Sequence, residues 1–203
     1  MENSTFRFRK TVQKVTRQQP EFIVYTGPMF SSKTSRLLAQ LERYKYQKKK
    51  VLVCKPKIDD RYDSDHIVSH IGLRHHANIV EDGTDILKLV AEYEGFPDVV
   101  ALDEAFMING MAEALIWLYR RGISIVVSTL DLSSNGKPFD EVKDLLVWST
   151  MIVKCPAVCT VCGADAFYTH KKLVNDDEIQ VGGSELYEPR CFQHHVYIND
   201  TNK

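Results

Sequence analysis

The chain has 203 residues, of which 44% are hydrophobic and 26% are charged, a balance typical of a globular protein with one sizeable core. Its net charge is −1, so no overall field holds it on nucleic acid or on a membrane surface. No apolar run approaches the ~20 residues that span a bilayer and no signal-peptide core follows the N-terminus, so a cytoplasmic protein without membrane or nucleic-acid partners is expected.

Short apolar runs and helical patterns follow one another through most of the chain. Residues 1–20 are polar and basic and predict an N-terminal arm with little core of its own. Between residues 21 and 153, strands are predicted at 22–26, 51–54, 78–81, 98–102 and 123–130, and helices at 33–47, 85–94 and 111–120. Because buried strands joined by helices form parallel sheets covered on both faces, this segment predicts an α/β domain.

The last segment, residues 154–203, predicts a small β-rich lobe with too little apolar content to fold alone. Four of the five cysteines lie between residues 155 and 191, and their C-x-x-C spacing favours metal over disulfides. Two pairs, separated by 28 residues, predict a closed tetrahedral site for structural Zn²⁺: Cys159, Cys162, Cys191 and His194. Cys155 and His195 are close enough in sequence to compete as ligands.

The segment GPMFSSKT, residues 27–34, lies between the first predicted strand and the first helix. It matches the phosphate-binding pattern G-x-x-x-x-G-K-[ST] except at Ser32, so the α/β domain is expected to be P-loop NTPase-like. In such a loop the backbone N–H groups cradle phosphates, Lys33 reaches the β- and γ-phosphates and Thr34 binds Mg²⁺. The predicted nucleotide contacts in the loop are Gly27, Pro28, Met29, Phe30, Ser31, Ser32, Lys33 and Thr34.

Ser32 stands where glycine is usual because the backbone approaches the phosphates there. A negative φ at this position makes the serine harmless. A positive φ predicts strain of about 1 kcal/mol and looser nucleotide binding.

Two carboxylates, Asp103 and Glu104, follow the predicted strand 98–102. In a phosphate-loop enzyme this strand end holds Mg²⁺ and places a base beside the attacking hydroxyl, so Asp103 is assigned to the metal and Glu104 to the base. The alternative is that the pair merely caps the next helix. The catalytic interpretation requires Lys33 and Glu104 to converge on one cleft.

The order of these motifs resembles the type II thymidine kinases, a family found in animal cells, many bacteria, poxviruses and large phages. The resemblance covers about residues 21–195 and is carried by GPMFSSKT, KIDDRYDS, LDEAF, TLDLSSNGKPF, CTVC, YTHKKL, VGGSELYEPRC and CFQH. It implies ATP-dependent phosphorylation of the 5′-hydroxyl of thymidine, with Mg²⁺ accompanying ATP, and a homotetramer. It also implies that residues of the lobe form a loop that closes over the nucleoside.

The resemblance further assigns residues by position. Asp59 and Arg61 match a D-x-R element beside the phosphates, where Arg61 offsets charge during transfer. The positions that match the nucleoside pocket are Phe106, Met107, Leu130, Ser134, Thr169, Val181, Gly182, Gly183 and Tyr187. The family usually reads D-E-x-Q-F after this strand, whereas here the amide is replaced by Phe106 and the aromatic by Met107, and an aromatic often found near the base falls on Ser134. The base pocket is therefore altered.

Two other functions compete with a kinase. Ser32, Phe106 and Met107 are compatible with a catalytically weak or inactive regulator that binds nucleosides or nucleotides on the same fold. A nucleic-acid-handling ATPase is disfavoured, because the charge is near neutral and residues 155–203 lack basic residues interleaved with aromatics.

Overall fold

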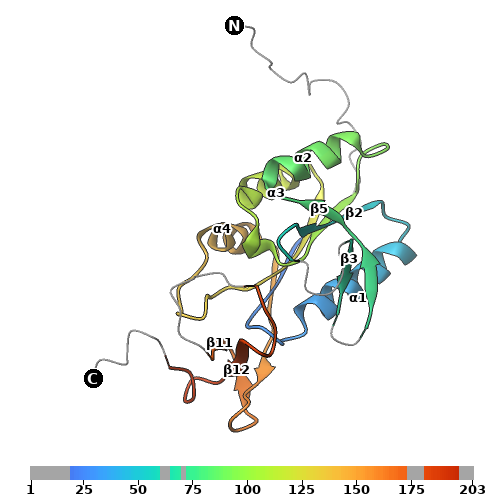
Figure 1. Cartoon of the computed structure of the whole chain (residues 1–203). Coiled ribbons are helices and arrows are strands. Elements are labelled where there is room, and N and C mark those ends of the chain that lie inside the picture. The colour runs from blue at the N-terminus through green and yellow to red at the C-terminus, as the bar shows by residue number, and fades with distance from the viewer. Residues whose placement is uncertain (1–18, 60–64, 70–71, 173–180, 197–203) are drawn as a thin grey trace, which may run out of the picture.

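The computed structural model describes residues 19–59, 65–69, 72–172 and 181–196, and its centre is a six-stranded sheet (Figure 1). The strand order is β5-β2-β6-β7-β1-β8, and every neighbouring pair is parallel. The strands are β1 (Phe22–Thr26), β2 (Val51–Pro56), β5 (Asn78–Val80), β6 (Val99–Leu102), β7 (Ser124–Thr129) and β8 (Met151–Lys154). The helices are α1 (Lys33–Tyr46), α2 (Gly83–Glu92), α3 (Met111–Tyr119) and α4 (Asp140–Trp148). The predicted parallel α/β fold is confirmed.

Alternate side chains of β1, β2, β6 and β7 enter different cores, and helices cover both faces of the sheet (Figure 1). On one face Ile23 and Tyr25 of β1 pack with Leu37 and Leu41 of α1. On the other face, α2, α3 and α4 supply the packing partners of the alternate strand residues. The continuous apolar runs of the sequence therefore follow from burial on two sides.

Two elements of the α/β segment, one helix and one strand, were not predicted. Helix α4 buries only Val142 and Leu145, so its apolar periodicity is weak. Strand β8 lies at one end of the sheet and exposes Met151 and Ile152, which removes the usual signal of a buried strand. A short antiparallel pair, β3 (His66–Val68) and β4 (Arg74–His76), was also missed, because four of its six residues are polar and all three residues of β4 are exposed.

The C-terminal lobe consists of two antiparallel pairs. Strands β9 (Ala157–Val158) and β10 (Asp165–Ala166) form one, and β11 (Tyr168–Lys171) and β12 (Tyr187–Arg190) form the other. In the part of the lobe that the structure describes, the buried apolar cluster consists of Ala157, Cys159, Ala166 and Cys191. The expected β-rich character is present, and the apolar core is as small as the sequence suggests.

The carboxyl ends of the parallel strands meet at one edge of the sheet, where ligands of open α/β folds bind. Residues 27–34 follow β1, and Asp103 and Glu104 follow β6. Residues 1–18 of the predicted arm lie outside the described residues. Within the described part of the chain, no helix has the length and apolar character needed to cross a bilayer.

Candidate active site and metal centre

The backbone of residues 27–34, which leads from β1 into the first turn of α1, is held in one conformation. Gly27 has φ +136°, and a Cβ on it would lie 2.3 Å from the carbonyl oxygen of Cys155, so only glycine fits there. The Ser31 hydroxyl donates to the carbonyl oxygen of Pro28 at 2.7 Å and closes the turn. Because the turn leads into the N-terminus of α1, its N–H groups and the helix dipole favour an anion.

Lys33 is buried inside this turn. Its Nζ donates to the carbonyl oxygen of Pro28 at 2.6 Å. Burial lowers the pKa of Lys33, and the negative charges of Glu104 and Asp103 oppose that shift. The lysine nitrogen therefore lies close to the two carboxylates of the β6 end.

Ser32 has φ +59°. Of the two cases considered from the sequence, the one with a positive φ and a strained backbone therefore applies. Its side chain makes no capping hydrogen bond that would offset the energetic cost of the left-handed conformation. We expect Ser32→Gly to raise the free energy of unfolding by about 1 kcal/mol relative to Ser32→Ala, which keeps the Cβ. Denaturant unfolding of both variants measures this difference, and equal stabilities would contradict the strain.

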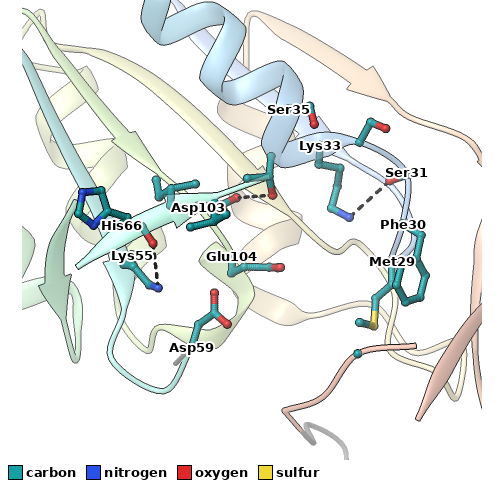
Figure 2. A pocket seen from close by; sticks show the side chains of 15 residues that line it. Met29, Phe30, Ser31, Lys33, Ser35, Lys55, Asp59, His66, Asp103 and Glu104 are labelled. Carbon is teal, nitrogen blue, oxygen red and sulfur yellow. Dashed lines mark hydrogen bonds between the residues drawn. The ribbon is translucent and has the colours of Figure 1, made fainter. Parts of the chain in front are cut away.

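A pocket opens where the turn meets the ends of β2 and β6 (Figure 2). Lys33 and Glu104, 71 positions apart in the chain, both line it. The other charged side chains of its wall come from different elements and include Lys55, Asp59 and Asp103. The required convergence of Lys33 and Glu104 on one cleft is thus a feature of the structure.

Thr34 and Asp103 form a pair of oxygen donors in the pocket. The Thr34 hydroxyl donates to Oδ1 of Asp103 at 3.3 Å. Burial raises the pKa of Asp103 to about 7, and the neighbouring charges of Glu104 and Asp59 act in the same direction. A hydroxyl beside carboxylates suits Mg²⁺, and a cation here would relieve their mutual repulsion, so the donor set fits the expected metal.

Glu104 adopts a left-handed backbone conformation with φ 48° and ψ 43°. The short helix η1 (Ala105–Met107) begins directly after it. A left-handed conformation is costly for a residue with a Cβ and is retained where the surrounding structure demands it, often at active sites. The strain at Glu104 and its place in the pocket point to a functional carboxylate more than to a simple helix cap, for which η1 is very short.

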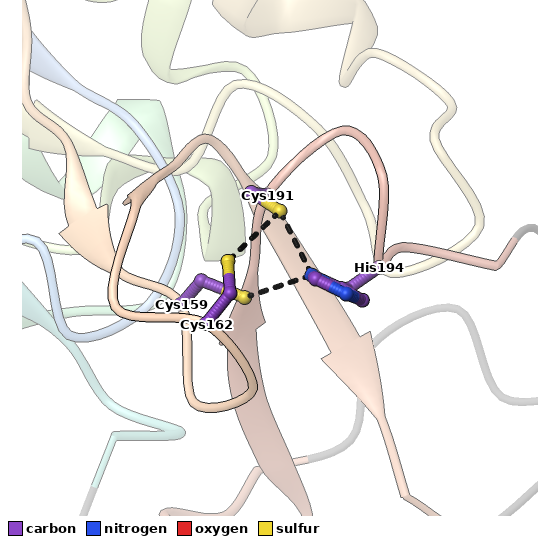
Figure 3. A group of neighbouring side chains, drawn as sticks. All are labelled: Cys159, Cys162, Cys191 and His194. Carbon is purple, nitrogen blue, oxygen red and sulfur yellow. Dashed lines mark hydrogen bonds between the residues drawn. The ribbon is translucent and has the colours of Figure 1, made fainter.

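The predicted metal ligands lie together in the C-terminal lobe (Figure 3). The potential ligand atoms of Cys159, Cys162, Cys191 and His194 all lie within 4.8 Å of one another. Burial raises the pKa of the Cys159 thiol, but backbone N–H groups around it, first that of Cys191, outweigh burial and lower it to about 6. The thiolate, which is the form that binds metal, is therefore favoured.

The spacing of these atoms fits a tetrahedral ion. Zinc–sulfur bonds of about 2.3 Å place two sulfurs about 3.8 Å apart in a tetrahedron. The Sγ atoms of Cys162 and Cys191 are 3.7 Å apart, and His194 Nδ1 lies 3.7 Å from Cys159 Sγ and 3.2 Å from Cys191 Sγ. The donor set therefore suits structural Zn²⁺ and has no position left for a substrate.

The two competing ligands lie elsewhere. Cys155 belongs to the segment that packs against Gly27, outside the cluster. His195 is buried and stacks on Tyr168 with ring centroids 4.9 Å apart. The geometry thus selects His194 over its neighbour.

A family of known proteins matches most of the chain. The family model described as thymidine kinase matches residues 21–195. The chain belongs to the thymidine kinase family. It is also 40% identical over 183 residues to the thymidine kinase of Thermococcus kodakarensis, an alignment that covers 85% of this chain and 92% of that protein. The resemblance inferred from the motifs is confirmed, and with it the assignment of the chain to a family of kinases.

The D-x-R element expected in thymidine kinases is partly described. Asp59 is buried and lines the pocket near the end of β2. Arg61 lies outside the described residues. The acidic member of the element is therefore placed beside Asp103 and Glu104, and the role of Arg61 stays a prediction.

The positions expected to contact the nucleoside in a thymidine kinase are spread over several elements. Gly183 lines the pocket. Thr169 lies on β11, where its hydroxyl accepts a hydrogen bond from the backbone N–H of Met29 at 3.0 Å. Phe106 turns toward α4 and packs on Phe139, with ring centroids 4.9 Å apart.

The remaining positions do not form part of the described pocket wall. Leu130 and Tyr187 are buried, whereas Met107, Ser134, Val181 and Gly182 are half-buried. The segment 173–180, which joins β11 to these last residues, lies outside the described residues. Their contacts with a nucleoside stay predictions.

Five residues of the described pocket wall escaped sequence reasoning: Ser35, Lys55, His66, Ile67 and Val68. Lys55 is 3% exposed on β2, and its Nζ donates to the carbonyl oxygen of His66 at 3.2 Å. His66 itself also lines the pocket. A lysine within the otherwise apolar run VLVCKP was the one available signal, because a buried charge needs a partner or a function.

Proposed function

We propose that this member of the thymidine kinase family transfers the γ-phosphoryl group of ATP to the 5′-hydroxyl of thymidine or a closely related deoxynucleoside. The observation that supports this most is that Lys33, Asp103 and Glu104 line one pocket at the carboxyl edge of the sheet. In our proposal the α/β segment 21–153 is the kinase domain, and the segment 154–203 is a zinc-binding lobe that closes over the nucleoside.

In the proposed reaction the 5′-oxygen forms a bond to the γ-phosphorus while the bond from that phosphorus to the β–γ bridging oxygen breaks, which releases ADP. Glu104 accepts the proton of the 5′-hydroxyl. The loop N–H groups and Lys33 hold the phosphates, and Arg61 offsets charge that builds during transfer. Magnesium, when bound through Thr34 and Asp103, would neutralise phosphate charge. Structural zinc would keep the lobe folded.

The test is phosphorylation of thymidine, deoxyuridine, 5-modified deoxyuridines and deoxycytidine, each with ATP and Mg²⁺. We expect thymidine monophosphate as a product. The rates with the other nucleosides show which bases fit the pocket, whose sequence differs from the family pattern at Phe106, Met107 and Ser134.

Nucleotide binding without any monophosphate product would instead identify the second candidate, a weak or inactive regulator. The positive φ of Ser32 and the packing of Phe106 against Phe139 favour that alternative. Absence of both binding and product would overturn the kinase proposal and the regulator together.

We also propose assembly into a homotetramer, which the family resemblance implies. Apolar side chains are exposed near the edge strand β8, and burial between subunits would remove them from water. They are Val147, Trp148, Met151 and Ile152. Light scattering at several concentrations tests the assembly, and a monomer at all of them would contradict it.

A further inference from the structure

The C-terminal segment holds the phosphate loop from two sides. At the beginning of the loop, the backbone N–H of Cys155 donates to the carbonyl oxygen of Thr26 at 2.7 Å, and the Cys155 carbonyl packs against Gly27. Two residues further along the loop, the N–H of Met29 donates to the Thr169 hydroxyl at 3.0 Å. The position of residues 27–29 is thus set by residues that lie more than a hundred positions later in the chain.

Thr169 is well placed to act as a fixed support. It is 4% exposed and lies inside β11, where it pairs with Pro189 of β12. Strand β12 leads directly into the metal ligand Cys191. On the other side, the N–H of Thr160, next to Cys159, donates to the Pro189 carbonyl at 3.2 Å. A short series of backbone contacts therefore runs from both metal-binding turns to Thr169.

We infer that Thr169 is a positioning residue, whose hydroxyl holds the Met29 N–H and thereby makes the shape of the phosphate loop depend on the metal-bound lobe. The inference rests on the proposed function, because it takes residues 27–34 as the ATP site. It differs from the family expectation for Thr169, which is contact with the nucleoside. Because coupling between two binding sites is reciprocal, ATP at the loop and zinc in the lobe favour each other's binding.

The decisive variants remove the hydroxyl at nearly constant size or keep it while removing the methyl group. Thr169→Val removes the acceptor, and Thr169→Ser retains it. Thr150→Val is a matched control, because Thr150 accepts the N–H of Phe22 at 2.9 Å, at the opposite end of the same strand β1. The control loses the bond from the Phe22 N–H, together with the 3.2 Å bond that the Thr150 hydroxyl donates to the Phe22 carbonyl, without touching the loop.

In zinc-loaded protein, we expect Thr169→Val to raise the dissociation constant of Mg–ATP about three- to tenfold, the effect of losing one ordinary hydrogen bond. The KM for thymidine should stay within about twofold of wild type, and Thr169→Ser and Thr150→Val should bind ATP like wild type. A higher KM for thymidine with unchanged ATP affinity would overturn the inference and place Thr169 at the nucleoside.

Two further measurements separate this inference from the proposed function. Hydrogen exchange of residues 27–34 needs no nucleotide, and it should quicken in Thr169→Val but stay as in wild type in Thr150→Val. Mg–ATP should slow zinc loss to a chelator in wild type and do so less in Thr169→Val. Unchanged exchange would overturn the positioning role even if ATP binds. Failure of wild type to bind ATP would reject the proposed function alone, because the exchange measurement still decides the contact.

Discussion

Glu104→Gln is expected to lower kcat by about 10²–10⁴-fold, the usual scale for a positioned acid–base group, with the fold intact. The amide has the same size as the carboxylate but cannot accept the 5′-hydroxyl proton at neutral pH. The side chain lies with Asp103 and Asp59 among like charges, whose repulsion helps to raise the pKa of Asp103. Removing one charge from this group should therefore not destabilise the protein.

Steady-state kinetics and thermal unfolding of the purified variant test both parts of this expectation. Glu113→Gln supplies a matched control, since Glu113 is exposed in the first turn of α3 and does not line the pocket. Near-normal turnover of Glu104→Gln would remove Glu104 from the reaction. Equal losses in both variants would point to a general effect of the amide substitution.

Loss of the metal ligands is expected to abolish the fixed structure of the C-terminal lobe. Among the described residues, the lobe's buried apolar cluster has four members, and two of them, Cys159 and Cys191, are themselves proposed ligands. So little apolar burial cannot offset the conformational entropy of the lobe, whereas structural zinc contributes about 10 kcal/mol or more to the folding of small sites. Cys191→Ser or chelation should therefore increase proteolysis and hydrogen exchange across residues 157–196.

The zinc content of each preparation must be measured together with its structure. His195→Phe is the matched control, because it preserves a ring beside Tyr168 and lies outside the cluster, and it should retain one zinc per chain. An ordered lobe after verified metal loss would contradict a structural role. Loss of zinc from His195→Phe would mean that His195 again competes with His194 as the zinc ligand.

Local patterns predicted the fold because their physical causes are local. The runs at β1 and β6 are continuously apolar since both of their faces are covered, and the paired x2 spacings bring ligands to one turn each. The phosphate loop was readable for the same reason, as a turn between a buried strand and an amphipathic helix.

Other features depend on partners that are distant in sequence. The positive φ of Ser32 is set by the closure of the loop, and a serine in the sequence does not indicate a positive φ. The bond from Met29 to Thr169 joins residues 140 positions apart, so no spacing rule reveals it. Lys55 is unusual in an apolar strand, but the sequence does not show that its side chain lines the pocket. These are the residues for which the sequence allowed several outcomes.

The position of β1 within the sheet has a consequence for biosynthesis. Strand β1 is synthesised early, whereas its partners β7 and β8 come much later in the chain. Ile23 pairs with Val126 on one side and with Met151 on the other. Chains emerge from the ribosome N-terminus first, at about 5–20 residues per second. The apolar first strand therefore lacks its first partner until β7 is complete at residue 129, when almost two-thirds of the chain has been translated, and its apolar side chains can bind chaperones during that interval.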